Sequence, residues 1–245
     1  MQKTPVKLPH LFFAVEGVDG AGKTSVIIPY LKKQIQKVFD EFVPGCGDMV
    51  VTTREPGGTP FAEKIRQLVL SDDAKEVSAF TQSLLMHAAR REHCETCILP
   101  ALQRGMAVIT DRFSLSTYIY QNISIQSHRS LNNLSTLAKP KWVLFADVSP
   151  QNALERLTMR GSDDNNHFDP KTLDEFAKRR DKANAALRVF KDEFPATNVE
   201  MIDTNTSIND VKHQIRRFVE NSVYPYISER SAFYQTIKTN QESGE

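Results

Sequence analysis

The sequence predicts an α/β fold in which one parallel sheet of five strands is flanked by helices on both faces. Short apolar segments alternate with longer segments of helical periodicity along the chain of 245 residues. Such alternation is typical of parallel sheets, because successive parallel strands are usually joined by a helix. A glycine-rich loop also separates the first apolar segment from the first helical one. The length suits one sizeable domain with its own core.

The expected strands are the apolar segments at residues 11–16, 49–53, 106–110, 142–147 and 199–203. The expected helices are residues 23–40, 61–71, 76–104, 114–127, 150–160, 171–194 and 207–222. No repeat and no linker rich in Pro, Gly or Ser divides the chain, so we expect a single domain over residues 1–222. In such sheets the functional site lies at the carboxyl ends of the strands.

Two further segments stand out. Residues 161–170 are polar, carry turn residues and lie between two expected helices, so a lid is expected at about residues 160–170. Residues 223–245 form a C-terminal extension, and we expect its aromatic first part to pack on the domain and its last few residues to be frayed.

Composition narrows the class of protein. The formal net charge is +1, with lysines and arginines spread along the chain, so neither nucleic acid nor membrane is an expected partner. The sequence contains no run of about 18 apolar residues, so no membrane-spanning helix is expected. Residues 1–7 lack the apolar segment of a secretory signal. We therefore expect a soluble, cytoplasmic protein.

The three cysteines, Cys46, Cys94 and Cys97, are too few for a disulfide framework. Cys94 and Cys97 have the spacing of redox and zinc sites, but no second ligand pair accompanies them. We expect two small, partly buried side chains one helical turn apart.

The glycine-rich loop has the spacing of a P-loop. Residues 17–24 read Gly-Val-Asp-Gly-Ala-Gly-Lys-Thr, between an apolar strand and a helix. Backbone N–H groups at such a helix N-terminus can hold phosphate oxygens. Lys23 can add a charge over the outer phosphates, and the Thr24 hydroxyl can bind Mg²⁺. The residues expected to bind ATP here are Gly17, Val18, Asp19, Gly20, Ala21, Gly22, Lys23, Thr24 and Ser25.

Two other strands end in charged residues. Arg54 follows the second strand in an Arg-Glu-Pro-Gly-Gly turn and can present a planar fork to a phosphate, although an ordinary turn with a solvated arginine is the alternative. Asp111 and Arg112 follow the third strand. Asp111 can hold Mg²⁺ through water, and Arg112 can stabilise charge on a transferring phosphoryl group. A local ion pair between these two residues is the alternative.

Two helices carry candidate base-binding residues. Met86 and Arg90 lie four residues apart on one helix face, which suits a flat polar ring. A core methionine and a solvated arginine are the alternative. Ser116, Thr117, Tyr120 and Gln121 follow the third strand and can line the same cavity, or belong to a surface helix.

Together these segments closely resemble the thymidylate kinase family, whose members phosphorylate dTMP with ATP. The resemblance covers roughly residues 11–220 and implies a P-loop kinase fold. Its most specific parts are the P-loop, the Arg-Glu-Pro-Gly-Gly turn and the Asp-Arg-Phe sequence at residues 111–113. The segments that carry the resemblance are residues 16–24, 53–59, 62–66, 88–90, 111–113, 115–117, 120–121, 147–148 and 160–161.

The resemblance implies a role for each matching residue. Lys23, Asp111 and Arg112 are implied in catalysis, with Mg²⁺ at Thr24 and Asp111. Asp19 is implied to meet the acceptor sugar or phosphate. Arg54 and Arg112 are implied to bind the dTMP phosphate, and Arg90 to hydrogen-bond the pyrimidine. The residues implied to line the base and sugar pocket are Met86, Ser116, Thr117 and Gln121. Arg156 and Arg160 are implied to lie near the ATP base or the lid. A homodimer is also implied.

The sequence departs from the family pattern at two places. The family commonly stacks thymine on a phenylalanine where this chain has Met86, which predicts a looser base pocket. The family also supplies a phosphate-neutralising arginine from the P-loop or the lid, yet no Lys or Arg lies between Gly161 and Pro170. The candidates for this role are Arg160, Arg179 and Arg180.

Two other functions remain open from the sequence. Met86 leaves a second function open, that of a broader pyrimidine deoxynucleoside monophosphate kinase that accepts dUMP or a 5-substituted dUMP. The acidic lid segment leaves a third function open, that of a P-loop protein that binds nucleotide without catalysis. No strong general base is expected in the kinase, because an acceptor phosphate oxygen is already a competent nucleophile.

Overall fold

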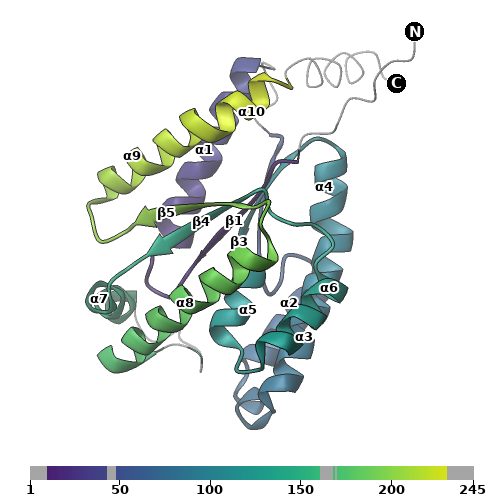
Figure 1. Ribbon diagram of the computed structural model, residues 1–245, viewed down its shortest axis with the longest axis vertical. Helices are drawn as coiled ribbons and strands as arrows, with labels where there is room; N and C mark the ends of the chain where they lie inside the picture. The colour runs from purple at the N-terminus through teal and green to yellow at the C-terminus, as the bar shows by residue number, and fades with distance from the viewer. Residues whose placement is uncertain (1–9, 43–47, 161–167, 169, 231–245) are drawn as a thin grey trace.

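The computed structural model describes residues 10–42, 48–160, 168 and 170–230, with the side chain of Arg160 excepted. It contains one five-stranded sheet in the order β2-β3-β1-β4-β5, and all neighbouring strands are parallel (Figure 1). The predicted five-stranded parallel sheet with flanking helices is therefore confirmed. The strands are β1 (Phe12–Gly17), β2 (Val50–Arg54), β3 (Ala107–Asp111), β4 (Trp142–Asp147) and β5 (Asn198–Asp203).

Helices cover both faces of the sheet. Figure 1 shows α1 (Ile28–Phe42), α9 (Ile208–Phe218) and α10 (Tyr224–Ser228) grouped on one face. The opposite side carries α5 (Ser114–Tyr120) and α8 (Leu173–Glu193), with α2 and α3 side by side further out. The other helices are α2 (Pro60–Leu70), α3 (Ala79–His93), α4 (Leu99–Gln103), α6 (Ile125–Ser135) and α7 (Pro150–Arg160), and the short turns are η1 (Lys23–Ile27), η2 (Asp72–Glu76), η3 (Cys94–Ile98) and η4 (Val219–Val223).

Successive side chains of β1 point to opposite faces and build two parts of the core. The Phe13 ring stacks on Trp142 at a centroid distance of 4.7 Å, on the side where Phe218 of α9 packs. The Phe12 ring meets Phe113 edge-on at 5.1 Å on the other side. All these rings are buried. The strand that leads into the glycine-rich loop is therefore fixed from both faces.

The predicted single helix over residues 114–127 is wrong. The chain turns to an extended conformation at Gln121, and α6 begins after Ser124, whose side chain accepts a hydrogen bond from the Ser127 amide. A serine that caps a new helix stabilises such a break. Because α5 ends at Tyr120, Gln121 lies just outside the helix, and its buried side chain reaches the site cavity.

The chain after α9 packs on the domain as far as the structure describes it. The Tyr224 hydroxyl donates to Glu41 Oε1 at 2.6 Å, and the Tyr226 ring meets Trp142 at 5.2 Å. The predicted fraying of the last residues and most of the predicted lid lie outside the described residues. Within the described residues, no helix is both long enough and apolar enough to cross a membrane.

Candidate active site

One cavity of about 540 Å³ opens at the carboxyl ends of β1, β2 and β3. The glycine-rich loop forms one wall, and the turn after β2 together with α3 and α5 forms the other. The sequence-predicted residues that line this cavity are Asp19, Gly20, Ala21, Gly22, Lys23, Thr24, Ser25, Arg54, Met86, Arg90, Asp111, Arg112, Ser116, Thr117, Tyr120, Gln121 and Arg156. Predictions made from five separate segments of sequence thus converge on one space.

The glycine-rich loop packs tightly on α7. Gly20 has φ +77°, and a Cβ atom there would lie 2.7 Å from the Ala153 carbonyl oxygen. Both the left-handed conformation and the close approach require glycine at this position. The helical turn that follows Gly22 has no side-chain cap, in contrast to α2, which is capped by Thr59. N–H groups at an uncapped helix start can bind an anion.

Lys23 folds back over the loop. Its Nζ donates to the carbonyl oxygens of Gly17 at 3.0 Å and Val18 at 2.8 Å. Burial, with a further contribution from Arg112, lowers the pKa of Lys23 to about 8. An incoming phosphate would offset both effects and favour the charged form.

Thr24 and Asp111 form a site that fits Mg²⁺. Thr24 Oγ1 donates to Asp111 Oδ2 at 2.5 Å, so a hydroxyl and a carboxylate meet at the loop. The other oxygen, Asp111 Oδ1, is buried and has no hydrogen-bond partner among the described residues. The described part of the chain holds no cluster of three or more His, Cys, Asp or Glu able to bind a metal ion. This small donor set suits Mg²⁺, which usually takes one or two carboxylates plus substrate phosphates and water.

Arg112, Asp19 and Tyr120 form a compact charged cluster between the two walls. Arg112 Nη2 donates a hydrogen bond to Asp19 Oδ1, and the Tyr120 hydroxyl donates one to Asp19 Oδ2 at 2.5 Å. The guanidinium lies over the Tyr120 ring, 4.6 Å from its centroid. Burial acts to raise the pKa of Asp19, but Arg112 and Lys23 outweigh it and the pKa is lowered. Asp19 is therefore a carboxylate held by two hydrogen-bond donors.

Arg54 and Arg66 line the cavity from the turn after β2 and from α2. Arg54 binds Glu63 through two parallel hydrogen bonds of 3.1 and 2.8 Å. Its side chain is 54% exposed, so this pair costs little to separate. Arg66 Nη1 donates to the Pro56 carbonyl at 3.0 Å. Burial, with repulsion from Arg54, lowers the pKa of Arg66.

Arg90 is buried and almost fully engaged by protein groups. Nε donates to Glu55 Oε2 at 2.8 Å, Nη2 to Thr117 Oγ1 at 2.6 Å and Nη1 to Asn132 Oδ1 at 3.2 Å. The Phe113 ring lies beneath the guanidinium at 5.2 Å. A guanidinium has five N–H donors, so few remain for a ligand. Arg90 is consequently a rigid, pre-oriented element of the cavity wall.

The floor of the cavity joins β1 to α5. The buried Glu16 carboxylate accepts hydrogen bonds from the backbone amides of Phe113 and Ser116 and from the Ser116 hydroxyl. Burial raises the pKa of Glu16 despite these bonds. Close by, Gln121 Nε2 is buried and has no partner among the residues that the structure describes. That unpartnered donor is available to a ligand.

The other predicted arginines separate clearly. Arg156 donates to the carbonyl oxygens of Gly20 and Thr204, so in this structure it braces the loop. Arg180 is bound to Asp147 by two hydrogen bonds of 3.0 and 2.8 Å. The Arg179 guanidinium, in contrast, lies over the Tyr120 ring, 4.5 Å from its centroid. The side chain of Arg160 lies outside the described residues.

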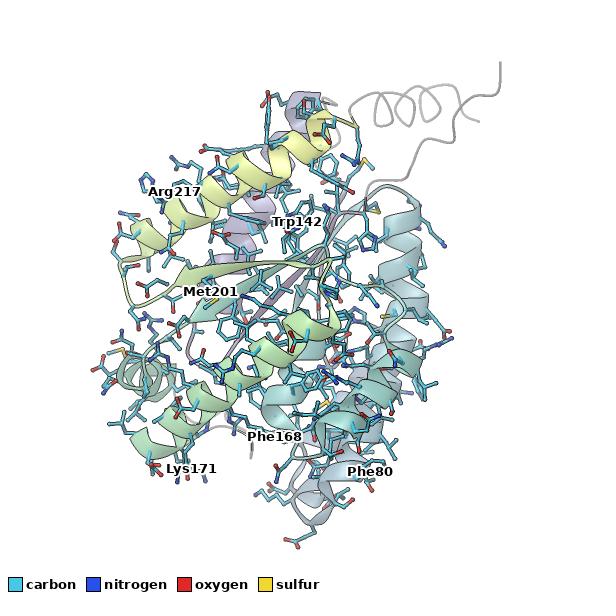
Figure 2. All side chains as sticks on the ribbon, in the orientation of Figure 1. Phe80, Trp142, Phe168, Lys171, Met201 and Arg217 are labelled. Carbon is cyan, nitrogen blue, oxygen red and sulfur yellow. The ribbon has the colours of Figure 1, made fainter. Side chains whose placement is uncertain are left out.

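Sequence reasoning missed several lining residues: Glu55, Pro56, Arg66, Leu70, Phe113, Leu157 and Phe168. Of these residues, Arg66 carried a usable signal. Glu63 and Arg66 are three residues apart in a helix that starts at the Thr59 cap, so both face the Arg-Glu-Pro-Gly-Gly turn. Phe168 (labelled in Figure 2) reaches the site only through tertiary packing. Its carbonyl oxygen accepts a hydrogen bond from Arg179 Nη2 at 3.0 Å, and its ring lies edge-on to Tyr120.

Comparisons with known proteins agree with this geometry. A family model described as thymidylate kinase matches residues 15–215. A thymidylate kinase of Nitrosospira multiformis is 38% identical over 221 residues, covering 86% of this chain and 96% of that protein. One of Finegoldia magna is 34% identical, covering 83% and 95%. A crystal structure of thymidylate kinase from Ehrlichia chaffeensis superposes with a TM-score of 0.60 at 26% identity, covering 86% of this chain and 98% of that one. This chain belongs to the thymidylate kinase family.

Proposed function

We propose that this protein transfers the γ-phosphoryl group of ATP to the phosphate of dTMP, giving dTDP and ADP. The observation that carries the proposal is a single cavity of about 540 Å³ with a phosphate-binding loop on one wall and Arg54, Arg90 and Arg112 on the other. Phosphoryl transfer requires two anionic substrates to be held in line while charge on the transferred group is neutralised.

The loop wall binds the donor. The backbone of residues 17–25 holds the ATP phosphates, and Lys23 exchanges its carbonyl partners for the outer phosphates. Thr24 and Asp111 would hold Mg²⁺, with Asp111 acting through water. The ion supplies neutralising charge to the phosphate oxygens.

The opposite wall binds the acceptor phosphate. Arg54 can leave its exposed pair with Glu63 to bind the dTMP phosphate, because exposed pairs contribute only about 0–1 kcal/mol. Arg112 stays on Asp19 and Tyr120, where it faces both substrates. Asp19 accepts hydrogen bonds from these two groups and has no proton to lose at neutral pH. The acceptor oxygen is the nucleophile, and no side chain has to act as its base.

The base lies between Met86, Phe113 and the donors beneath them. Arg90 offers the N–H donors that remain after its protein contacts, and Gln121 Nε2 offers an unpartnered one. Thr117 orients Arg90, and Ser116 ties the sugar side of the pocket to Glu16. This arrangement reads the polar edge of a pyrimidine through fixed groups.

Of the two candidates whose side chains the structure describes, Arg179 is better placed than Arg180 to replace the missing lid arginine. Its guanidinium and that of Arg112 each lie over the Tyr120 ring, at 4.5 and 4.6 Å. Its Nη1 is buried without a partner in the described part of the chain. Arg180, by contrast, has both sides of its fork on Asp147. We propose that Arg179 neutralises the transferred phosphoryl group.

A broader acceptor range is the second candidate, and Met86 favours it. Met86 is only partly buried and packs against a small cluster formed by α2 and α3. A thioether on three rotatable bonds covers a ring less rigidly than an aromatic side chain. On this basis dUMP or a 5-substituted dUMP is accepted beside dTMP.

The experiment is a panel of acceptors. ADP formation from Mg-ATP is measured alone and then with dTMP, dUMP, dCMP or UMP, each with and without excess EDTA. The proposal predicts turnover that needs both Mg²⁺ and an acceptor and is fastest with dTMP. Equal ADP formation without any acceptor contradicts transfer to a nucleotide, and faster turnover with dUMP favours the broader enzyme.

We also propose that two copies of the chain associate through α2 and α3. These helices lie side by side (Figure 1) and expose four large apolar side chains, Phe61, Leu68, Phe80 and Leu84. Exposed apolar surface of this kind marks an interface. Light scattering on the double variant Leu68→Glu, Leu84→Glu should give a monomer where the unaltered chain gives a dimer. Ile208→Glu on α9, also exposed, is the control that leaves the mass unchanged.

A further inference from the structure

A chain of hydrogen bonds runs from Arg90 away from the cavity to the end of α8. Arg90 Nη1 donates to Asn132 Oδ1 on α6 at 3.2 Å, and Asn132 Nδ2 donates to Glu193 Oε1 at 3.4 Å. The other oxygen of Glu193 accepts a hydrogen bond from the Tyr118 hydroxyl on α5. Glu193 is the last residue of α8 and is half-buried, whereas the other three side chains are buried. Of these four residues only Arg90 lines the cavity.

The partners of Asn132 allow only one orientation of its side-chain amide. A guanidinium donates hydrogen bonds and accepts none, so Asn132 must turn its oxygen toward Arg90. A carboxylate accepts hydrogen bonds and donates none, so the amide nitrogen must face Glu193. Turning the amide over would set donor against donor on one side and acceptor against acceptor on the other. Glu193 therefore fixes the acceptor that Asn132 presents to Arg90.

His87 lies beside this contact but does not replace Asn132 as the acceptor. Its Nδ1 is 3.5 Å from Arg90 Nη1. The Ser135 hydroxyl donates to the Leu131 carbonyl at 2.9 Å, so at 2.7 Å it accepts the hydrogen of His87 Nδ1. A ring nitrogen that carries its hydrogen cannot accept another. Within the part of the chain that the structure describes, Asn132 is consequently the group that sets the direction of Nη1.

The contacts of Arg90 leave hydrogens on both terminal nitrogens for a ligand. Nε is bound to Glu55, and Nη1 and Nη2 each give one hydrogen, to Asn132 and Thr117. Each terminal nitrogen of a guanidinium carries a second hydrogen. Arg90 can therefore offer donors, and only donors, to a base in the cavity that it lines.

A wall of donors distinguishes pyrimidines by the group at position 4 of the ring. Thymine and uracil carry a carbonyl oxygen there, which accepts a hydrogen bond from Arg90. Cytosine carries an amino group, whose hydrogens meet the hydrogens of the guanidinium. A site that pairs with one polar group strongly rejects an analogue that leaves its own groups unpaired. This selection requires Arg90 to keep its direction.

We propose that Asn132 and Glu193 are positioning residues that hold Arg90 toward the acceptor base and so make the site select thymine or uracil over cytosine. Both residues act through Arg90, and the proposal rests on the proposed function. Loss of either residue lets the guanidinium turn, which weakens its bond to dTMP and removes its opposition to dCMP. The ratio of kcat/KM for dTMP over dCMP should fall about threefold to thirtyfold, as expected for a change within one coupled network.

The test compares Asn132→Leu and Glu193→Ala with the unaltered protein. The exposed neighbours supply matched controls, Asn133→Leu and Asp192→Ala. Steady-state kinetics gives kcat/KM for dTMP and dCMP, and calorimetric titration without ATP gives the Kd of each nucleotide. Both ratios should fall in the first two variants and stay unchanged in the controls. A variant that is merely less well folded loses activity with both acceptors and keeps the ratio.

An exchange of donor and acceptor provides a rescue. Asn132→Asp alone sets one carboxylate against another and should lower the ratio. The double variant Asn132→Asp, Glu193→Gln keeps an oxygen toward Arg90 and supplies an amide donor from the end of α8. The net charge of the pair is then the same as in the unaltered protein. We expect the double variant to recover most of the lost selectivity.

Three outcomes overturn the proposal. The first is a ratio in Asn132→Leu and Glu193→Ala equal to that of their controls. The second is a double variant no more selective than Asn132→Asp. The third is an unaltered protein that binds dCMP as tightly as dTMP. The Kd values need no phosphoryl transfer, and turnover is measured on the unaltered enzyme, so failure of this proposal is distinguished from failure of the proposed function.

Discussion

The proposed base end of the cavity, at Arg90 and Glu55, and its proposed phosphate end, at Arg54 and Lys23, hold their charges in opposite ways. At the base end, Arg90 and Glu55 are 3% and 4% exposed, and each is bound to several protein groups. At the phosphate end, Arg54 is half exposed on a single carboxylate, and Lys23 holds only two carbonyl oxygens. In the proposed function, the base would be read by a fixed network, whereas the phosphates would be bound by groups that exchange partners.

Glu55→Gln breaks the base end and should have the largest effect. The variant leaves the Arg90 and His93 cations buried without their shared carboxylate. Removing one partner of a buried ion pair costs about 3–5 kcal/mol. Urea denaturation should show this loss of unfolding free energy. Glu63→Gln, which breaks the exposed pair with Arg54, is the matched control and should cost at most about 1 kcal/mol. Equal losses in the two variants would erase the contrast between the two ends.

Arg179→Ala tests the phosphate end. Loss of a cation that acts on the transferred group should lower kcat about 10²-fold to 10³-fold. Arg180→Ala, one residue along α8, removes only the pair with Asp147 and should lower kcat less than about threefold. Steady-state kinetics with saturating Mg-ATP and dTMP measures both. A larger loss in Arg180→Ala would reverse the assignment.

Acid should weaken the base end through two buried histidines. Burial lowers the pKa of His87 to about 2 and that of His128 to about 4. The unfolded chain takes up protons below pH about 6.5 and the folded chain does not, so stability is lost as the pH falls below that value. Between pH 6.5 and 5 the loss is about 2 kcal/mol for each histidine.

His93 acts in the opposite direction. Its pKa is raised to about 9, so its contribution is complete below pH about 6.5 and is lost as the pH rises through 9. Urea denaturation from pH 5 to 9 should therefore give a maximum near pH 6.5. His128→Gln should flatten the acid side, and the exposed His213→Gln should leave the profile unchanged. A profile that keeps rising from pH 6.5 to 9 would contradict the charged state of His93.

Met86→Phe sharpens the base end and should have the smallest effect. An aromatic ring in place of the thioether packs more rigidly on a pyrimidine. We expect the ratio of kcat/KM for dTMP over dUMP to rise about threefold to tenfold, since one methyl group in a pocket is worth about 1–3 kcal/mol at most. If the unaltered enzyme already favours dTMP over dUMP as strongly as Met86→Phe does, Met86 does not make the base pocket looser.

Local sequence was enough to predict the sheet and to select Lys23 and Asp111, which the structure brings to one cavity. The strand pattern, the glycine spacing around Lys23 and the position of Asp111 at a strand tip depend on neighbours in the chain. The stack of Arg112, Tyr120 and Arg179 was not predictable in this way, because it needs α8 to approach α5 in space. The helix break at Gln121 was missed because a periodic apolar pattern continues across it, and only Ser124 signals a new helix start.

In the proposed function, one cavity holds both substrates at once. A bisubstrate analogue, adenosine and thymidine joined by a chain of phosphates, tests it most directly in inhibition kinetics. We expect the analogue to compete with ATP and, in a separate series, with dTMP, because it occupies both walls. Inhibition competitive with one substrate and noncompetitive with the other would show that the two sites are separate.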